Sequence, residues 1–83
     1  MLQVLYYKSF DKSLARLQAK DRKKVIAAVS RLLDYFGGGP KPLGLGLRKL
    51  RGHYWEIRAS LEARVIFLLE ENMISFVIVG DHT

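Results

Sequence analysis

The chain has 83 residues, of which 49% are apolar and 27% are charged, and it contains no cysteine. These values indicate one soluble globular domain spanning residues 1–83, and they exclude a disordered tail, a disulfide framework and a thiolate metal site. The formal net charge of +6 favours polyanionic partners such as nucleic acid. No segment approaches the ~18 apolar residues of a membrane span and no signal peptide is evident, so we expect a cytoplasmic protein without a membrane partner.

A strand and a short helix are predicted at the start of the chain. The segment Leu2–Tyr7 is apolar and partly aromatic or β-branched, which is typical of a strand. Apolar residues then recur at helical spacing through residues 10–17. Because Ser9 precedes them and is a good N-cap residue, we expect a helix that follows Ser9 and ends near Gln18.

A second and longer helix is predicted from Asp21 to Phe36. Its apolar stripe consists of Val25, Val29, Leu32, Leu33 and Phe36. The run Gly37–Pro40 ends this helix, because glycine suits the C-terminal cap and proline cannot continue a helix. The two helices together resemble a helical hairpin packed on one side of a sheet.

The second half of the chain alternates between apolar and polar residues, as strands do. The predicted strands are Arg48–Leu50, Tyr54–Ser60, Arg64–Leu69 and Met73–Val79. The last of them is apolar on both faces, which indicates a central or covered position. We therefore predict an α+β fold of order β-α-α-β-β-β with an additional short strand near Leu47. The N-terminal strand and the helical hairpin pack on one face of a small, curved, mainly antiparallel sheet.

The alternation assigns the side chains of the central predicted strand to two faces. The set that faces the helices consists of Trp55, Ile57 and Ala59. Glu56 and Arg58 project from the opposite face, and Arg64 joins them if the alternating apolar residues of the next strand belong to the core. The expected result is one surface that carries a carboxylate and two guanidinium groups.

This surface has the parts that metal-independent RNA cleavage needs. A base removes the proton of the 2′-hydroxyl, cations stabilise the phosphorane, and an acid protonates the leaving 5′ oxygen. Arg58 and Arg64 suit the phosphate because a guanidinium fork matches two oxygens. Glu56 or Lys49 is the candidate base, and His82 is the candidate acid, since histidine exchanges protons near neutral pH.

Four further residues are candidates for holding the RNA without taking part in the reaction. They are Lys41, Arg48, Arg51 and Tyr54. Tyr54 is the one that could stack on a base. We expect Lys49 and Arg51 to border the reactive surface from the preceding strand and turn. No residue is expected to bind a metal ion, because two distant histidines without cysteine are a poor zinc site.

Each candidate also has a purely structural interpretation. Glu56 would be half of a cross-strand ion pair, and Arg58 and Arg64 would be solvated strand positions. Lys49 and Arg51 would be edge-strand charges that discourage edge-to-edge aggregation. His53 would be a surface residue in that turn, and His82 would belong to a frayed terminus.

Four segments carry a family resemblance: Lys49–Gly52, Tyr54–Arg58, Ala63–Phe67 and Val77–His82. In this order they resemble the RelE/ParE superfamily of bacterial toxins, in particular its RelE/HigB-like and phage Gp49-like members. The likeness covers most of the chain, because the leading strand, the helical hairpin and the curved sheet agree with the family in order and length.

The resemblance implies the toxin of a type II toxin–antitoxin pair. Such a toxin is an mRNA endoribonuclease (mRNA interferase) that needs no cofactor, commonly cuts in the ribosomal A site and so inhibits translation. The implied partners are a cognate antitoxin, mRNA and the ribosome. The implied assembly is a homodimer or a toxin–antitoxin hetero-oligomer.

The resemblance also implies roles for individual residues. Arg64 matches the arginine that stabilises the phosphate, and Arg58 and Glu56 match charged or acid–base positions on the preceding strand. The basic turn of the family corresponds to Lys49 and Arg51. His82 lies near the position where an acid–base histidine, tyrosine or arginine is often found.

Two departures from the family pattern keep alternatives open. Several relatives carry lysine where this chain has Glu56, so Glu56, Lys49 and His82 all stay candidates for the general base. Many relatives continue past the position of Thr83 with a tail that supplies a tyrosine. The alternative functions are a ParE-type toxin that poisons DNA gyrase and a catalytically inactive, toxin-like RNA-binding domain.

Overall fold

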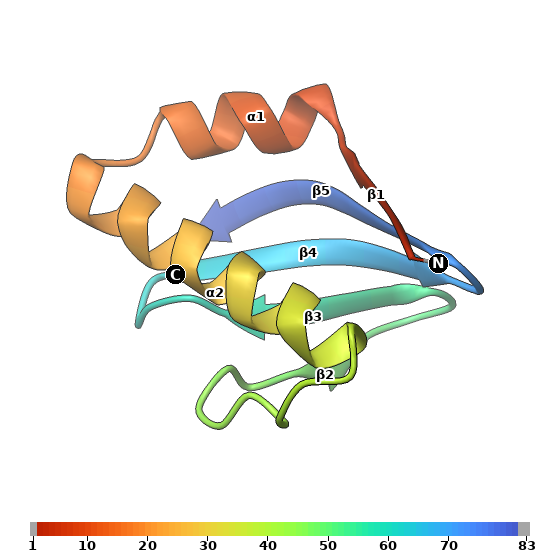
Figure 1. The fold of residues 1–83 in the computed structure, drawn as a ribbon. Coiled ribbons are helices and arrows are strands. Elements are labelled where there is room, and N and C mark those ends of the chain that lie inside the picture. The colour runs from red at the N-terminus through yellow and green to blue at the C-terminus, as the bar shows by residue number, and fades with distance from the viewer. Residues whose placement is uncertain (1, 82–83) are drawn as a thin grey trace.

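The computed structural model describes residues 2–81 and shows an α+β fold (Figure 1). The elements in chain order are β1 (Gln3–Tyr6), α1 (Lys8–Ala15), α2 (Ala19–Phe36), β2 (Arg48–Lys49), β3 (Tyr54–Arg58), β4 (Ala63–Glu70) and β5 (Met73–Asp81). This order confirms the predicted β-α-α-β-β-β arrangement, and β2 is the additional short strand. Neither helix in the described part of the chain is long and apolar enough to cross a membrane.

The five strands form one sheet in the order β1-β5-β4-β3-β2. Within residues 2–81, β1 and β5 are parallel, with Gln3 opposite Met73, and the other neighbouring strands are antiparallel. The first and the last strand of the chain are therefore neighbours, as Figure 1 shows for β1 in red and β5 in blue. The doubly apolar strand β5 lies between β1 and β4, as its sequence indicated.

The helices cover one face of the curved sheet and form the core with it. Figure 1 shows α2 crossing in front of the sheet and α1 running along β5. The largest fully buried side chains are Phe67, Phe76, Leu32, Ile57, Ile74, Val25 and Val65, which come from α2, β3, β4 and β5. Because α2 packs on this face and α1 lies along the free edge of β5, the opposite face of the sheet over β3 and β4 is left free of helices (Figure 1).

The start of the first helix differs from the sequence-based expectation. α1 begins at Lys8, its N-cap residue is Tyr7, and no side chain caps it, so the assignment of Ser9 as the cap is wrong. The Ser9 hydroxyl instead donates a hydrogen bond to the carbonyl of Val77. Ser13 accepts one from the backbone N–H of Val79 at 2.9 Å. Strand β5 extends beyond its pairing with β1, and its free backbone groups take these serine side chains.

The end of α1, the start of α2 and the end of β2 also differ from the predicted boundaries. Helix α1 ends at Ala15 rather than near Gln18, and α2 begins at Ala19, two residues before Asp21, with Gln18 as its N-cap residue. The short strand keeps only two residues of the predicted Arg48–Leu50, because the chain already turns there. Leu50 donates its N–H to the carbonyl of Tyr54 across this turn at 2.9 Å.

Candidate active site

The register of the strands brings three of the predicted site residues, Glu56, Arg58 and Arg64, together with Arg48. Arg48 lies opposite Glu56 on the β2–β3 pair, and Arg58 lies opposite Arg64 on the β3–β4 pair. Directly opposed residues project from the same face of a sheet, and the neighbouring Ile57 is fully buried under the helices. The four charged side chains therefore share the open face, which confirms the predicted grouping of Glu56, Arg58 and Arg64.

These side chains line a small hollow of about 90 Å³. Its walls are Gly46, Arg48, Glu56, Arg58 and Arg64. Pockets that enclose a whole small-molecule ligand usually measure about 300–1,000 Å³, so this hollow suits one compact group of a larger ligand. With three guanidinium groups against one carboxylate, that group should be an anion.

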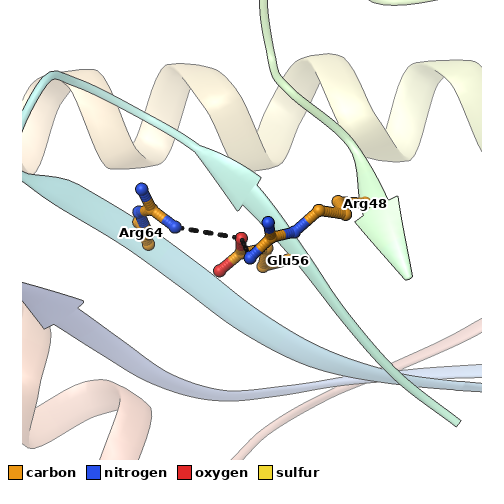
Figure 2. A network of polar contacts seen from close by, with 3 residues as sticks. All are labelled: Arg48, Glu56 and Arg64. Atoms are coloured by element: carbon orange, nitrogen blue, oxygen red, sulfur yellow. Dashed lines mark hydrogen bonds and ion pairs between the residues drawn. The ribbon is translucent and has the colours of Figure 1, made fainter. Parts of the chain in front are cut away.

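Glu56 is the most deeply buried charged residue of the site, at 7% relative exposure. Its Oε1 atom accepts a hydrogen bond from Arg64 Nη1 at 3.1 Å and lies 2.7 Å from Arg48 Nη2. Figure 2 shows the two guanidinium groups reaching this carboxylate from β4 and β2. An isolated carboxylate would lose several kcal/mol on burial, and the two cations offset this cost. Both contacts fall on Oε1, so Oε2 has no donor among residues 2–80.

Arg58 and Arg64 place two like charges side by side. They are direct cross-strand partners at the end of β3 and β4, an arrangement that costs free energy because the charges repel. Arg58 is exposed, whereas Arg64 is half-buried, and its buried Nε atom has no hydrogen-bond partner among the described residues. An anion bound between the two guanidinium groups would offset the repulsion.

Lys49 does not lie in the hollow. It is the direct partner of Trp55, which packs against the core on the helix-covered side. The side chain of Lys49 therefore projects from the opposite face to Arg48 and Glu56, and the expectation that it borders the reactive surface is wrong. Because β2 is an antiparallel partner of β3, its two residues must alternate as those of β3 do.

The other predicted RNA-binding residues are more dispersed. Tyr54 is on the open face opposite Leu68, two residues from Glu56 along β3, and is 44% exposed. Arg51 is exposed in the turn between β2 and β3, and Lys41 is exposed in the loop before β2. Neither Arg51 nor Lys41 lines the hollow.

The two histidines have different outcomes. His53 is exposed in the turn, as expected, and lines a separate groove with Glu70 and Glu71. His82, the candidate acid, lies outside the described residues. Among the residues that the structure describes, no three His, Asp or Glu side chains are close enough to hold a metal ion.

Two contributions to the site were missed at the level of sequence. Arg48 was assigned to RNA binding, but it also pairs with Glu56. Its register could have been found, because Arg48 and Glu56 are equidistant from Gly52, whose φ of +61° marks the centre of the turn. Gly46 forms one wall, since the backbone N–H of Arg58 donates to the carbonyl of Leu45 at 2.5 Å. No local signal in the sequence predicts this loop contact.

Solved structures share this fold, although no protein-family model and no curated protein matches the chain significantly. A chain of the E. coli DinJ–YafQ complex superimposes with a TM-score of 0.80 and 21% identity, covering 99% of this chain and 94% of that chain. A chain of the RelB–RelE antitoxin–toxin complex from Methanococcus jannaschii superimposes with a TM-score of 0.73 and 22% identity, covering 93% of this chain and 88% of that chain. A chain of the YoeB dimer from Staphylococcus aureus superimposes with a TM-score of 0.70 and 20% identity, covering 99% of this chain and 98% of that chain. The resemblance to RelE-type toxins is thus confirmed at the level of the fold.

Proposed function

We propose that this protein is the toxin of a type II toxin–antitoxin pair and acts as an mRNA endoribonuclease that inhibits translation. The observation that carries the proposal is the pair Arg58–Arg64 beside the buried carboxylate of Glu56 in a phosphate-sized hollow. The shared fold supports it, because similar structures come from antitoxin–toxin complexes.

The hollow would hold the phosphate at which the RNA is cut. Arg58 and Arg64 would bind its non-bridging oxygens and stabilise the extra negative charge of the phosphorane. The 2′ oxygen of the preceding ribose attacks phosphorus, and its proton passes to the free Oε2 of Glu56. The bond to the 5′ oxygen breaks, and that oxygen takes a proton from a general acid. The products are a 2′,3′-cyclic phosphate and a 5′-hydroxyl.

Glu56 is the base in this scheme because its position favours it over the other candidates. Lys49 projects from the far side of the sheet, beside Trp55. His82 stays the proposed acid on the strength of its place in the sequence. Arg48 would hold the carboxylate in place through its contact with Oε1 and would meet the RNA with the rest of its exposed side chain.

The proposed partners follow from the proposed activity. A cognate antitoxin would bind the toxin, and the RNA target would be mRNA in the cytoplasm, free or on the ribosome. The net charge of +6 would attract both the mRNA and an acidic antitoxin segment. Self-association is a further assembly to examine, since the S. aureus YoeB structure is a dimer.

Controlled expression tests the proposal. We expect induction to arrest growth with loss of translation, Arg64→Ala to relieve the arrest while the protein still folds, and purified protein to cut RNA with 2′,3′-cyclic phosphate ends. Undiminished toxicity of Arg64→Ala would reject the assigned site. Inhibition of DNA supercoiling without RNA cleavage would favour a gyrase poison, and RNA binding without cleavage would favour an inactive toxin-like domain.

A further inference from the structure

The open face of the sheet has a second, apolar half next to the charged hollow. Glu56 on β3 is opposite Ile66 on β4, and Ile66 is opposite Ile78 on β5. The row across the sheet therefore passes from a carboxylate to two isoleucines on the same face. Ile66 is half-buried and Ile78 is 41% exposed, so both offer apolar surface to a ligand.

The neighbouring row contains Arg58, Arg64 and Gly80. Gly80 is the direct partner of Arg64, and a Cβ atom built on it would meet no atom within 4 Å. Its φ is not positive, so the backbone does not require glycine there. Because Gly80 has no side chain, the surface of β5 next to Arg64 is an open strip on the open face of the sheet.

The spacing of these groups matches the parts of one nucleotide. Neighbouring strands lie about 4.8 Å apart, so Ile66 is one strand and Ile78 two strands from Glu56. Ile66 is two residues, or about 7 Å, along β4 from Arg64. A phosphate held by Arg58 and Arg64 would thus have free space over Gly80 and a flat apolar surface beside it.

We propose that Ile66 and Ile78, together with the open strip at Gly80, bind the nucleobase attached to the phosphate in the hollow. This inference rests on the proposed function, because it places the phosphate between Arg58 and Arg64. A nucleobase fits because it is flat, largely apolar on its faces and covalently joined to the anion that the hollow selects. Neither isoleucine has a side-chain hydrogen-bonding group, so this subsite accepts any base and contributes affinity without sequence preference.

Two non-cleavable ligands distinguish binding of the nucleobase from binding of the sugar–phosphate backbone. One is a short 2′-O-methyl oligonucleotide, which lacks the attacking hydroxyl, and the other is its abasic counterpart with the same phosphates. We expect Ile78→Ser to weaken binding of the first by about fivefold, the amount that loss of a modest apolar contact implies, and to leave the second unchanged. The matched control is Ile26→Ser on α2, because Ile26 is 57% exposed on the helical layer and should affect neither ligand.

Gly80→Val gives a second test that does not depend on removing apolar surface. Valine is a good strand residue and has room at this position, so the variant should be at least as stable as the parent protein. Its branched side chain would fill the strip beside Arg64. We expect it to weaken the base-bearing oligonucleotide more than the abasic one, while urea unfolding confirms an intact fold.

The outcomes distinguish this inference from the function on which it rests. If Arg64→Ala weakens both ligands but Ile78→Ser and Gly80→Val weaken neither, or weaken both equally, the base-binding subsite is wrong and the phosphate site stands. If the parent protein binds neither ligand, the proposed function and the subsite fail together. Ile78 also lines a groove with Ser13 of α1 and with Arg16, the C-cap residue of that helix. An Ile78→Ser variant that loses affinity only for the antitoxin would reassign this surface to protein binding.

Discussion

The two faces of the sheet differ in what their side chains do. The face under the helices is a continuous apolar core in which Phe67 and Phe76 are fully buried. The open face carries a buried carboxylate, two adjacent arginines and exposed isoleucine and tyrosine side chains. The first arrangement lowers the free energy of the folded chain. The second adds the repulsion between Arg58 and Arg64 and a desolvation cost of Glu56 that its ion pairs offset.

This difference distinguishes residues that stabilise the fold from residues that a stable fold does not require. A small domain has little stability to spare, so groups that repel or bury charge are expected to have a function. Glu56 and the Arg58–Arg64 pair are such groups, and they are neighbours on the same face. Substitutions on the covered face should therefore change stability, while substitutions on the open face should change RNA cleavage.

The largest expected effect is on the covered face. Phe67→Ala should lower the free energy of unfolding by about 3–5 kcal/mol, because it removes a fully buried ring and leaves a cavity. Tyr54→Ala on the open face is the matched control and should cost less than about 1 kcal/mol. Urea unfolding measures both. Equal losses for the two variants would remove the distinction between the faces.

On the open face, Arg64→Ala should lower the single-turnover rate of RNA cleavage by about 10²–10³-fold, the contribution of one fixed donor to a charged transition state. The protein should still unfold cooperatively, because Arg64 is not part of the core. Arg64→Lys keeps the charge without the planar fork and should give an intermediate rate. A parental rate in Arg64→Ala would mean that the phosphate is bound elsewhere.

The adjacent residues Arg48 and Lys49 compare the two faces within one strand. Arg48→Ala should reduce cleavage about tenfold, since it removes one charged contact to Glu56. Lys49→Ala should change it less than about twofold, because its side chain projects beside Trp55. A larger loss for Lys49→Ala than for Arg48→Ala would restore Lys49 as the general base.

The smallest expected effect is electrostatic. Binding of single-stranded RNA should weaken as salt rises, with a slope of log K against log salt near −0.7 for each neutralised phosphate. Arg58→Ala should make this slope shallower by about 0.7, because one contact is lost. Lys41→Ala, in an exposed loop outside the hollow, is the control. An unchanged slope in Arg58→Ala would exclude Arg58 from phosphate binding.

Local sequence patterns predicted the elements of the open face well. The alternation through Trp55, Glu56 and Ile57 predicted which residues share a face. The register of β3 and β4 and the burial of Val65 and Phe67 confirm this prediction. The family resemblance added the expected fold order. Both kinds of evidence depend on neighbours in the chain or on ordered motifs, which a sequence displays directly.

Contacts between distant segments could not be predicted in this way. Ser9 has the chemistry of an N-cap residue, but the free edge of β5 takes its hydroxyl 68 residues away. The loop carbonyl of Leu45 reaches Arg58 and places Gly46 at the hollow. The wrong face was predicted for Lys49 for a different reason. A strand of two residues shows no alternation of its own, so its partner strand determines the face, and the partner of Lys49 is Trp55.

The most direct test of the central claim is the rate of RNA cleavage by Glu56→Gln, measured together with its affinity for 2′-O-methyl RNA. Glutamine keeps the shape of the side chain but is not a useful base. We expect the single-turnover rate to fall about 10²–10⁴-fold while the affinity is kept or increased, because the arginines no longer pair with a carboxylate. A parental rate, or a loss of affinity as large as the loss of rate, would contradict the assignment of Glu56 as the base in this hollow.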